Sequence, residues 1–283
     1  MAVKFMIDSA SDVSKKEAQK LGVIMVPMTI TFDTETYLDG VYITSKEFYE
    51  KLIESDVLPK TSQINSFIFE EEYEKALSDG DQLIVITISS KLSATNASAV
   101  TAAEKFGDKV FVVDSLNAAI GERLLLEYGL LLREQGKTAK EIFQTLQKVK
   151  SKINVIALVD TLEYLKKGGR ISSATAFAGS LLSIKPVVAI QDGEVKLIGK
   201  AMGSKKGNNL LCKLVEEKGG IDFDMPFGTI WSGIEDSMLQ KYVKDSAHLW
   251  ESHTDTVPSH ALGGTIGTHV GPGVVGVAFF QKG

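Results

Sequence analysis

Apolar runs that suit β-strands alternate with helical patterns through the first half of the chain. The β-rich runs predict strands over Val3–Ile7, Val23–Phe32, Leu83–Ile88 and Val110–Val113. Amphipathic or Lys-rich spacing predicts helices that end at Leu21 and Lys105, and helices over Ser45–Glu54, Asn65–Leu77, Glu122–Gln135 and Thr138–Lys150. Strands separated by helices indicate βαβ units around a parallel sheet. We therefore expect an N-terminal three-layer α/β/α domain.

From Ile153 the pattern changes to strands that suit antiparallel pairing. They are predicted over Val155–Val159, Pro186–Ile190, Val195–Ile198, Phe227–Gly233, Thr254–Leu262 and Val274–Gln281. Asp192-Gly193 between two β-rich runs is a strong hairpin signal, and helices are predicted over Ser204–Glu217 and Ser237–Trp250. We expect an α/β protein of two domains, residues 1–155 and residues 156–283, the second of α+β type with antiparallel strands.

The composition narrows the function class. The 283 residues carry a net charge of −5 without a basic block, whereas nucleic-acid binding needs a Lys/Arg surface. The single cysteine, Cys212, excludes a disulfide framework and a cysteine-built zinc site. The first residues lack a signal-peptide pattern, and the apolar block Leu124–Leu132 is short and contains Glu127. We expect a cytoplasmic protein without nucleic-acid partners and without stable membrane insertion.

A stretch rich in hydroxyl groups, Thr87–Val100, follows the predicted strand Leu83–Ile88. Six Ser and Thr residues fall within fourteen positions, where a strand passes into a helix. Ser93 in this hydroxyl stretch suits an N-cap, but a cap leaves Thr95 and its neighbours unexplained. Loops at the carboxyl ends of parallel strands bind ligands, and a helix N-terminus favours an anion. We predict a carboxylate or phosphate site with Ser93 and Thr95 as donors, and capping is the alternative.

Two further segments carry candidate donors. Thr61 and Ser62 precede the helix predicted from Asn65, where they either donate to a ligand or cap the helix. His269 lies in a glycine-rich segment, Gly263–Gly276, which we expect to form a loop. Within this segment, Gly271–Gly276 matches G-x-G-x-x-G. The match is not a dinucleotide fingerprint, because the segment leads into a strand near the chain end. A loop histidine is a suitable donor to an anion, and a structural histidine is the alternative.

The sequence lacks the motifs of several enzyme classes. It contains no G-x-S-x-G elbow, no G-x-x-x-x-G-K-[ST] loop and no H-E-x-x-H motif, and its four histidines lack metal-ligand spacing. In D-S-A-S-D, from Asp8, we expect Ser11 or Asp12 to cap the next helix. Arg170 either pairs with a carboxylate across the domains or bonds the last carbonyls of the preceding helix. A site rich in donors but poor in nucleophiles, bases and metal ligands indicates a protein that holds a ligand more than it transforms one.

Taken in order, these motifs resemble the DegV family of bacterial lipid-binding proteins. The matching pieces span nearly the whole chain: D-S-A-S-D at Asp8, Y-L-D-G at Tyr37, T-S-Q at Thr61, I-S-S-K-L-S-A-T at Ile88, V-D-S at Val113, L-K-K-G-G-R-I at Leu165, I-K-P-V at Ile184 and G-T-H-V-G-P-G at Gly267. The resemblance implies two α/β domains with one long-chain fatty acid between them, its acyl chain in an apolar tunnel. For some members it implies a carrier role, in which an ATP-dependent kinase subunit converts the bound carboxylate to an acyl phosphate.

Carried to this chain, the resemblance implies that Thr61 and Ser93 donate to the carboxylate and that His269 lies close to the head group. Ser62 and Thr95 are added from the local pattern, and Arg170 is a candidate head-group or partner contact. No metal is expected, no cofactor apart from the bound fatty acid, and no catalysis by the chain itself.

The sequence departs from the family pattern at one position. After Lys200 the family commonly has an arginine, whereas this chain has Met202, which puts kinase coupling in question but not lipid binding. Two alternatives stay open. A small-molecule hydrolase or transferase would use Ser93 or His269, and a regulatory module would hold its lipid only as a stabiliser that co-purifies.

Overall fold

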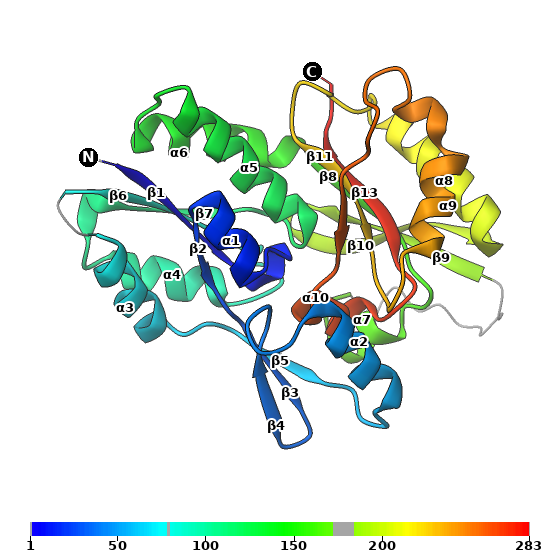
Figure 1. The fold of residues 1–283 in the computed structure, drawn as a ribbon, viewed down its shortest axis with the longest axis horizontal. Helices are drawn as coiled ribbons and strands as arrows, with labels where there is room; N and C mark the ends of the chain where they lie inside the picture. The colour runs from blue at the N-terminus through cyan, green and yellow to red at the C-terminus, as the bar shows by residue number, and fades with distance from the viewer. Residues whose placement is uncertain (1, 78–79, 172–183, 283) are drawn as a thin grey trace.

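Figure 1 shows the protein as a computed structural model that describes residues 2–77, 80–171 and 184–282. A four-stranded parallel sheet has the order β2-β1-β6-β7 and consists of β1 (Val3–Asp8), β2 (Ile24–Val26), β6 (Gln82–Thr87) and β7 (Val110–Asp114). Met6 of β1 lies opposite Ile24 on one side and Val85 on the other. The order of the strands reverses direction at β1 and β6, so their carboxyl ends form a topological switch point. The predicted parallel sheet is confirmed.

Helices cover both faces of this sheet, because its strands carry apolar side chains on both sides. On one face, Phe69 and Tyr73 of α3 and Ala99 of α4 belong to the same buried cluster as Met6 and Val85 of the sheet. Three helices cover the other face, where Ile142 belongs to the same buried cluster as the strand residues. The bounds are α1 (Lys15–Leu21), α3 (Ser66–Ala76), α4 (Thr95–Ala103), α5 (Ile120–Glu134) and α6 (Ala139–Val149).

Capping residues explain where several helices begin. Asn65 accepts a hydrogen bond from the N–H of Ile68 at the start of α3. Thr138 and Glu141 form a capping box at α6, with side chain and backbone bonded in both directions. These signals lie within a few residues of each helix start, which is why the sequence predicted both helices closely.

A second, six-stranded sheet contains the C-terminal half of the chain, in the order β10-β9-β8-β13-β11-β12. Its strands are β8 (Ile153–Leu158), β9 (Ile184–Gln191), β10 (Glu194–Met202), β11 (Phe227–Trp231), β12 (Ser259–Ala261) and β13 (Val275–Phe280). Neighbours pair antiparallel except β11 and β12, so the predicted antiparallel α+β half is confirmed. The predicted hairpin turns at Asp192 and Gly193, both with positive φ (52° and 82°). Helices α8 (Gly203–Glu217) and α9 (Ser237–Asp245) cover its outer face.

Helix α5 is the layer that the two sheets share. It contacts β1 and β6 of the parallel sheet and β8, β11 and β13 of the six-stranded sheet. Ten of its fifteen residues are buried, whereas a surface helix buries only one face. The layers therefore run from α3 and α4 through the parallel sheet, α5 and the six-stranded sheet to α8 and α9 (Figure 1).

A third, small sheet corrects one prediction. The run Val23–Phe32, predicted as one strand, divides into β2 and β3 (Thr29–Phe32), which belong to different sheets. Pro27 lies at the break, where it lacks an N–H for a continuing ladder. Strand β3 pairs with β4 (Glu35–Leu38) and β5 (Lys60–Ser62), and α2 (Ser45–Glu54) packs on this sheet, at the bottom of Figure 1.

The glycine-rich segment around His269 corrects a second prediction, because it forms helix α10 (Gly264–Val270) rather than a loop. A Cβ at Gly264 or Gly267 would come within 2.8 Å or 2.6 Å of the Phe48 ring. The glycines therefore let α10 approach α2 closely. Gly271 and Gly273, with φ of 71° and 82°, provide the turns that follow the helix.

Two predicted elements are shorter than expected. The strand expected over Thr254–Leu262 is reduced to β12, and the helix expected to reach Trp250 ends at Asp245. The remaining elements are α7 (Glu163–Lys167) and the 3₁₀ turns η1 (Ser9–Ser11), η2 (Gly107–Lys109), η3 (Lys150–Lys152) and η4 (Ala247–Leu249).

The predicted division between residues 155 and 156 falls inside β8 (Ile153–Leu158). This division stays a prediction. Among the described helices, none combines the length and the apolar character needed to cross a bilayer.

Candidate functional site

An apolar cavity of about 250 Å³ lies between the two main sheets, outside the carboxyl end of β6. The inner face of the six-stranded sheet and the segment before α5 supply its walls, and the hydroxyl stretch lies at one end. Wall residues include Val155, Ala157, Val188, Ile230, Ala118 and Ala119. Its position at a topological switch point is the one expected for a ligand site in an open α/β sheet.

Polar side chains meet at one end of this cavity. Thr61 from β5, Ser93 from the hydroxyl stretch and His269 from α10 all line it, although up to 208 residues separate them along the chain. Thr61 Oγ1 and His269 Nε2 are 2.9 Å apart. The structure thus brings together three residues that the sequence predicted as one site.

The imidazole of His269 is neutral at pH 7. Burial, with a smaller effect of the Arg170 charge, lowers its pKa from 6.5 to about 4. Nδ1 is buried without a hydrogen-bond partner among the described residues. An unpaired acceptor costs less than an unpaired N–H, so we assign the proton to Nε2, which donates to Thr61. Thr61 then keeps its own hydroxyl hydrogen for a ligand.

The hydroxyl group of Ser93, like that of Thr61, accepts hydrogen bonds from its neighbours. Its Oγ accepts from the N–H of Thr95 (3.2 Å) and lies 2.9 Å from Thr95 Oγ1, which itself accepts from the N–H of Ile64 at 3.4 Å. Either hydroxyl can be the donor of the Ser93–Thr95 bond. Because Thr95 is fully buried and Ser93 lines the cavity, we assign the hydrogen of this bond to Thr95, which leaves the Ser93 hydroxyl hydrogen free. Ser93 therefore presents one free donor to the cavity. Thr95 is fully buried behind it and supports Ser93.

Both predicted capping roles need revision. Ser93 lies one residue before the N-cap of α4, Ala94, and bonds the first helical N–H from there. Asn65, not Thr61 or Ser62, caps α3. Thr61 and Ser62 lie in β5, where successive side chains point to opposite faces. Ser62 is exposed and is not among the described residues that line the cavity.

Arg170 makes the second of its two predicted contacts. Its Nη1 donates to the carbonyl of Gly168 (2.6 Å), just after α7, and its Nε donates to the carbonyl of Leu92 (3.2 Å). The side chain lines the cavity and connects the end of α7 to the hydroxyl stretch. Its contact with a ligand or partner stays a prediction.

Sequence reasoning missed one face of α10. Thr265, Ile266, His269 and Val270 all line the cavity, at the i, i+1, i+4, i+5 spacing of a helix face. The Thr265 hydroxyl is buried without a hydrogen-bond partner in the described part of the chain. The helical spacing was present in the sequence, but the surrounding glycines obscured it.

The D-S-A-S-D segment also differs from its prediction. Ser14, not Ser11 or Asp12, caps α1. Asp8 is buried and accepts from the N–H groups of Ala10 and Ile88, and burial raises its pKa to about 7. Asp12 accepts from the N–H of Gly263, at the far end of the chain. This segment therefore connects β1 to the hydroxyl stretch and to α10.

An outer hollow of about 380 Å³ adjoins the polar end of the cavity and shares Thr61, Arg170 and His269 with it. Lys60, Lys167 and Tyr164 also line this outer hollow, and both lysines are exposed. The polar end of the cavity is thus next to a solvent-facing hollow lined by three cationic side chains, of which Lys167 is paired with Glu163. Across residues 2–77, 80–171 and 184–282, no three His, Cys, Asp or Glu side chains are grouped to hold a metal ion.

Comparisons with known proteins agree with this architecture. The model of the DegV family, described as a family of uncharacterised proteins, matches residues 2–282. A DegV domain-containing protein of Deinococcus radiodurans is 33% identical over 282 residues, 98% of each chain. A second one, from Caldanaerobacter subterraneus, is 32% identical and covers 99% of each.

Solved structures give the same result. A DegV family protein from Thermus thermophilus, described by its fatty acid binding, has a TM-score of 0.88 and 30% identity over 100% of both chains. DegV of Bacillus subtilis, described as a fatty acid binding protein, has a TM-score of 0.84 and 28% identity, again over 100% of both chains. The fold and the whole-length matches show that this chain belongs to the DegV family.

Proposed function

We propose that this protein binds one long-chain fatty acid, with the acyl chain in the cavity between the sheets and the carboxylate at Thr61 and Ser93. The observation that carries the proposal is an apolar cavity lined at one end by the hydroxyl groups of Thr61 and Ser93. The fatty acids bound by the related proteins of Thermus thermophilus and Bacillus subtilis support it. The neutral imidazole of His269 donates a hydrogen bond to Thr61 and so leaves the Thr61 hydroxyl hydrogen for the carboxylate.

The energetics favour an apolar ligand. Each buried CH₂ contributes about 0.8 kcal/mol, so roughly a dozen methylenes contribute about 10 kcal/mol before the costs of ordering the chain. Two neutral hydroxyl donors add less than this and mainly set the orientation of the ligand. The cavity therefore supplies most of the affinity, and the polar end decides which way the molecule lies.

Conservative variants test the head-group assignment. Thr61→Val and Ser93→Ala each remove one donor to a charged group, so palmitate affinity should fall about tenfold or more. Isothermal titration with delipidated protein measures it, and native mass spectrometry of freshly purified protein identifies any lipid already bound. Ser62→Ala is the matched control on the same strand. Unchanged affinity in Thr61→Val, Ser93→Ala and their double variant would exclude the assignment.

The finer part of the proposal is a carrier role, in which a cytoplasmic ATP-dependent kinase phosphorylates the bound carboxylate. The outer hollow supports it, because Lys60 and Arg170 line it beside Thr61 and His269, and positive charge stabilises an incoming phosphoryl group. Neutral donors at Thr61 and Ser93 leave the carboxylate its charge for attack on phosphorus. Met202 is 61% exposed at the end of β10 and accessible to a partner.

A reconstituted reaction tests the carrier role. Palmitate-loaded protein, a bacterial fatty acid kinase subunit and Mg-ATP should yield palmitoyl phosphate and ADP, with the acyl phosphate trapped by hydroxylamine as a hydroxamate. Met202→Arg should raise the rate if this position contacts the kinase. ATP consumption that does not depend on the loaded protein would reject the carrier role and leave lipid binding intact.

The hydrolase alternative has little support in the geometry. In the described structure, Ser93 Oγ bonds to Thr95 and His269 Nε2 bonds to Thr61, so the two candidate catalytic groups have different partners. A nucleophilic serine needs a base within hydrogen-bond reach. We therefore retain binding as the proposed function.

A further inference from the structure

Helix α10 carries four of the side chains that line the cavity, so its position decides the shape of the polar end. The helix has only seven residues, and its N-cap, Gly263, has no side chain with which to cap it. Short helices are marginal without external support. The structure must therefore hold α10 from outside.

Two carboxylates from the N-terminal part of the chain bond the start of α10. Asp12 Oδ1 accepts from the N–H of Gly263 at 2.7 Å. Asp39 accepts from two consecutive N–H groups, Gly264 at Oδ1 and Thr265 at Oδ2, both at 3.0 Å. Three adjacent backbone donors are thus satisfied by side chains more than 220 residues away in sequence. We call this arrangement the α10 clamp.

Both carboxylates are themselves held in place. Asp39 is 2% exposed, and its N–H bonds the carbonyl of Met28 beside β3. Asp12 follows η1 in the left-handed conformation, with φ of 61°. Burial raises the pKa of both carboxyl groups, and the N–H bonds from α10 act in the opposite direction. The clamp thus comes from two segments on the N-terminal side, next to η1 and next to β3.

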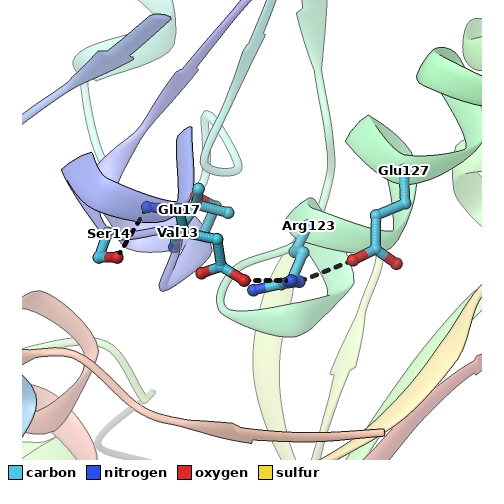
Figure 2. Close-up of polar contacts among 6 residues, drawn as sticks. Val13, Ser14, Glu17, Arg123 and Glu127 are labelled. Atoms are coloured by element: carbon cyan, nitrogen blue, oxygen red, sulfur yellow. Dashed lines mark hydrogen bonds and ion pairs between the residues drawn. The ribbon is translucent and has the colours of Figure 1, made fainter. Parts of the chain in front are cut away.

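The nearby arginine is already paired, as Figure 2 shows. Arg123 is 7% exposed and bonds Glu17 of α1 at 2.6 Å and Glu127 of α5 at 2.8 Å. Its charge is therefore balanced by two other carboxylates. Asp12 and Asp39 accept from the backbone N–H groups at the start of α10, where an acceptor near a helix N-terminus is favourable.

The far end of the helix is fixed from the six-stranded sheet. Ser232, just after β11, donates to the carbonyl of Gly271 and accepts from the N–H of Val274, both at 2.8 Å. His269 lies near this end and meets Thr61 across the cavity. A shift of about 1 Å in α10 would break a hydrogen bond of this length.

We infer that Asp12 and Asp39 are positioning residues of the head-group site: they hold α10 so that His269 Nε2 bonds Thr61 and Thr265 faces the cavity. Neither residue is among the described residues that line the cavity. The part of this inference that concerns affinity rests on the proposed function. The part that concerns His269 does not, because it applies to the protein without ligand.

The test follows the His269 ring directly, by ¹⁵N NMR of histidine-labelled, delipidated protein, with His269→Gln to assign its signals. Asp39→Asn keeps the shape of the side chain but replaces one carboxylate oxygen with an NH₂ group. That NH₂ group then faces the N–H of Gly264 or Thr265, which loses its acceptor. Asp12→Gly removes the other acceptor and suits the left-handed φ. Each should shift the ring nitrogens of His269 and weaken palmitate binding about tenfold. If Asp39→Asn does not fold, Asp12→Gly carries the same test.

Two controls make the result specific. Asp222→Asn alters a carboxylate that also accepts a backbone N–H, from Asp224, at an exposed turn. Leu239→Ala lowers stability from the outer side of the six-stranded sheet. Both should leave the His269 signals unchanged. His269 signals in folded Asp39→Asn and Asp12→Gly that coincide with wild type would overturn the inference. Wild-type protein that binds no palmitate, with shifted His269 signals in the variants, would reject the proposed function and support the clamp.

Discussion

At the scale of single residues, the polar end of the cavity depends on how a few groups share hydrogen atoms. Thr61 and Ser93 each accept bonds from neighbours and keep one hydrogen for a ligand. His269 supports Thr61 only while its ring occupies its present place. Gly168 lies directly against Nδ1 of that ring, so the absence of a side chain at residue 168 is part of the site.

Gly168→Ala should disturb the site without straining the backbone, because φ at residue 168 is an ordinary −75°. Its Cβ would overlap His269 Nδ1, so the ring must move away from Thr61. Overpacking of this kind costs about 1–3 kcal/mol, and palmitate affinity should fall about tenfold. Titration calorimetry measures it. Gly199→Ala, which meets only the end of the Leu210 side chain and Val187, is the control. Equal affinities in both variants would contradict the role of Gly168.

The lowered pKa of His269 predicts a pH dependence of stability. Its folded pKa of about 4 lies below the usual 6.5, so the unfolded chain takes up the proton first. The contribution of the neutral His269 to the free energy of unfolding is complete above pH 6.5 and is lost as the pH falls toward 4. Between pH 7 and pH 5, wild type should lose about 2 kcal/mol more than His269→Gln in urea unfolding. Buried carboxyl groups with raised pKa titrate in the opposite sense, and this comparison cancels them. Parallel pH profiles would show that His269 is not buried as described.

At the scale of elements, the site depends on a close contact between two short helices. α10 approaches α2 because Gly264 and Gly267 leave room for the Phe48 ring. The small sheet beneath α2 carries Thr61, so this contact also fixes the distance between β5 and His269. Here glycines determine packing rather than flexibility.

Gly267→Ala tests this contact. Its Cβ would lie 2.6 Å from Phe48 Cε1 and from the Tyr49 hydroxyl oxygen, so the variant should lose about 1–3 kcal/mol of unfolding free energy. Urea denaturation measures it. In the double variant with Phe48→Leu, the loss should be smaller than the sum of the two single losses. Strict additivity would show that α10 and α2 do not contact each other in this way.

At the scale of the whole molecule, the cavity is formed where two sheets face each other across the start of α5. Val155, Ala157 and Val188 from the second sheet face Ala118 and Ala119, which precede that helix. Small residues on both sides leave space that close packing would otherwise fill. Neither half of the chain encloses this space alone.

Ala157→Leu should reduce the length of the cavity, because residue 157 lies in the cavity wall. The added methyl groups point into the space proposed for the acyl chain, so binding should shift from palmitate toward laurate. Competition between the two acids, read by mass spectrometry of the extracted ligand, measures the shift. Val277→Ile, on the outer face of the neighbouring strand β13, is the control for added bulk. An unchanged preference in Ala157→Leu would mean that the chain does not lie against β8.

Sequence alone determined most of the elements, because periodicity and caps are local. Asn65 and Thr138 start their helices through side chains within three residues, and Asp192-Gly193 sets a hairpin by its own backbone preference. Pro27 is likewise a local signal for the division of Val23–Phe32, because it lacks an N–H for a continuing ladder. Hydroxyl groups at strand ends and family motifs were enough to name Thr61, Ser93 and His269 as candidates.

Tertiary structure alone decided how these candidates work together. That α10 is a helix follows from aromatic neighbours on α2 and from Asp12 and Asp39, none of which is near it in sequence. The same distant contacts separate Ser62 from Thr61, place Thr265 at the cavity and lower the pKa of His269. Local propensity is a property of neighbouring residues, whereas burial and long-range hydrogen bonds exist only once the two halves of the chain have packed together.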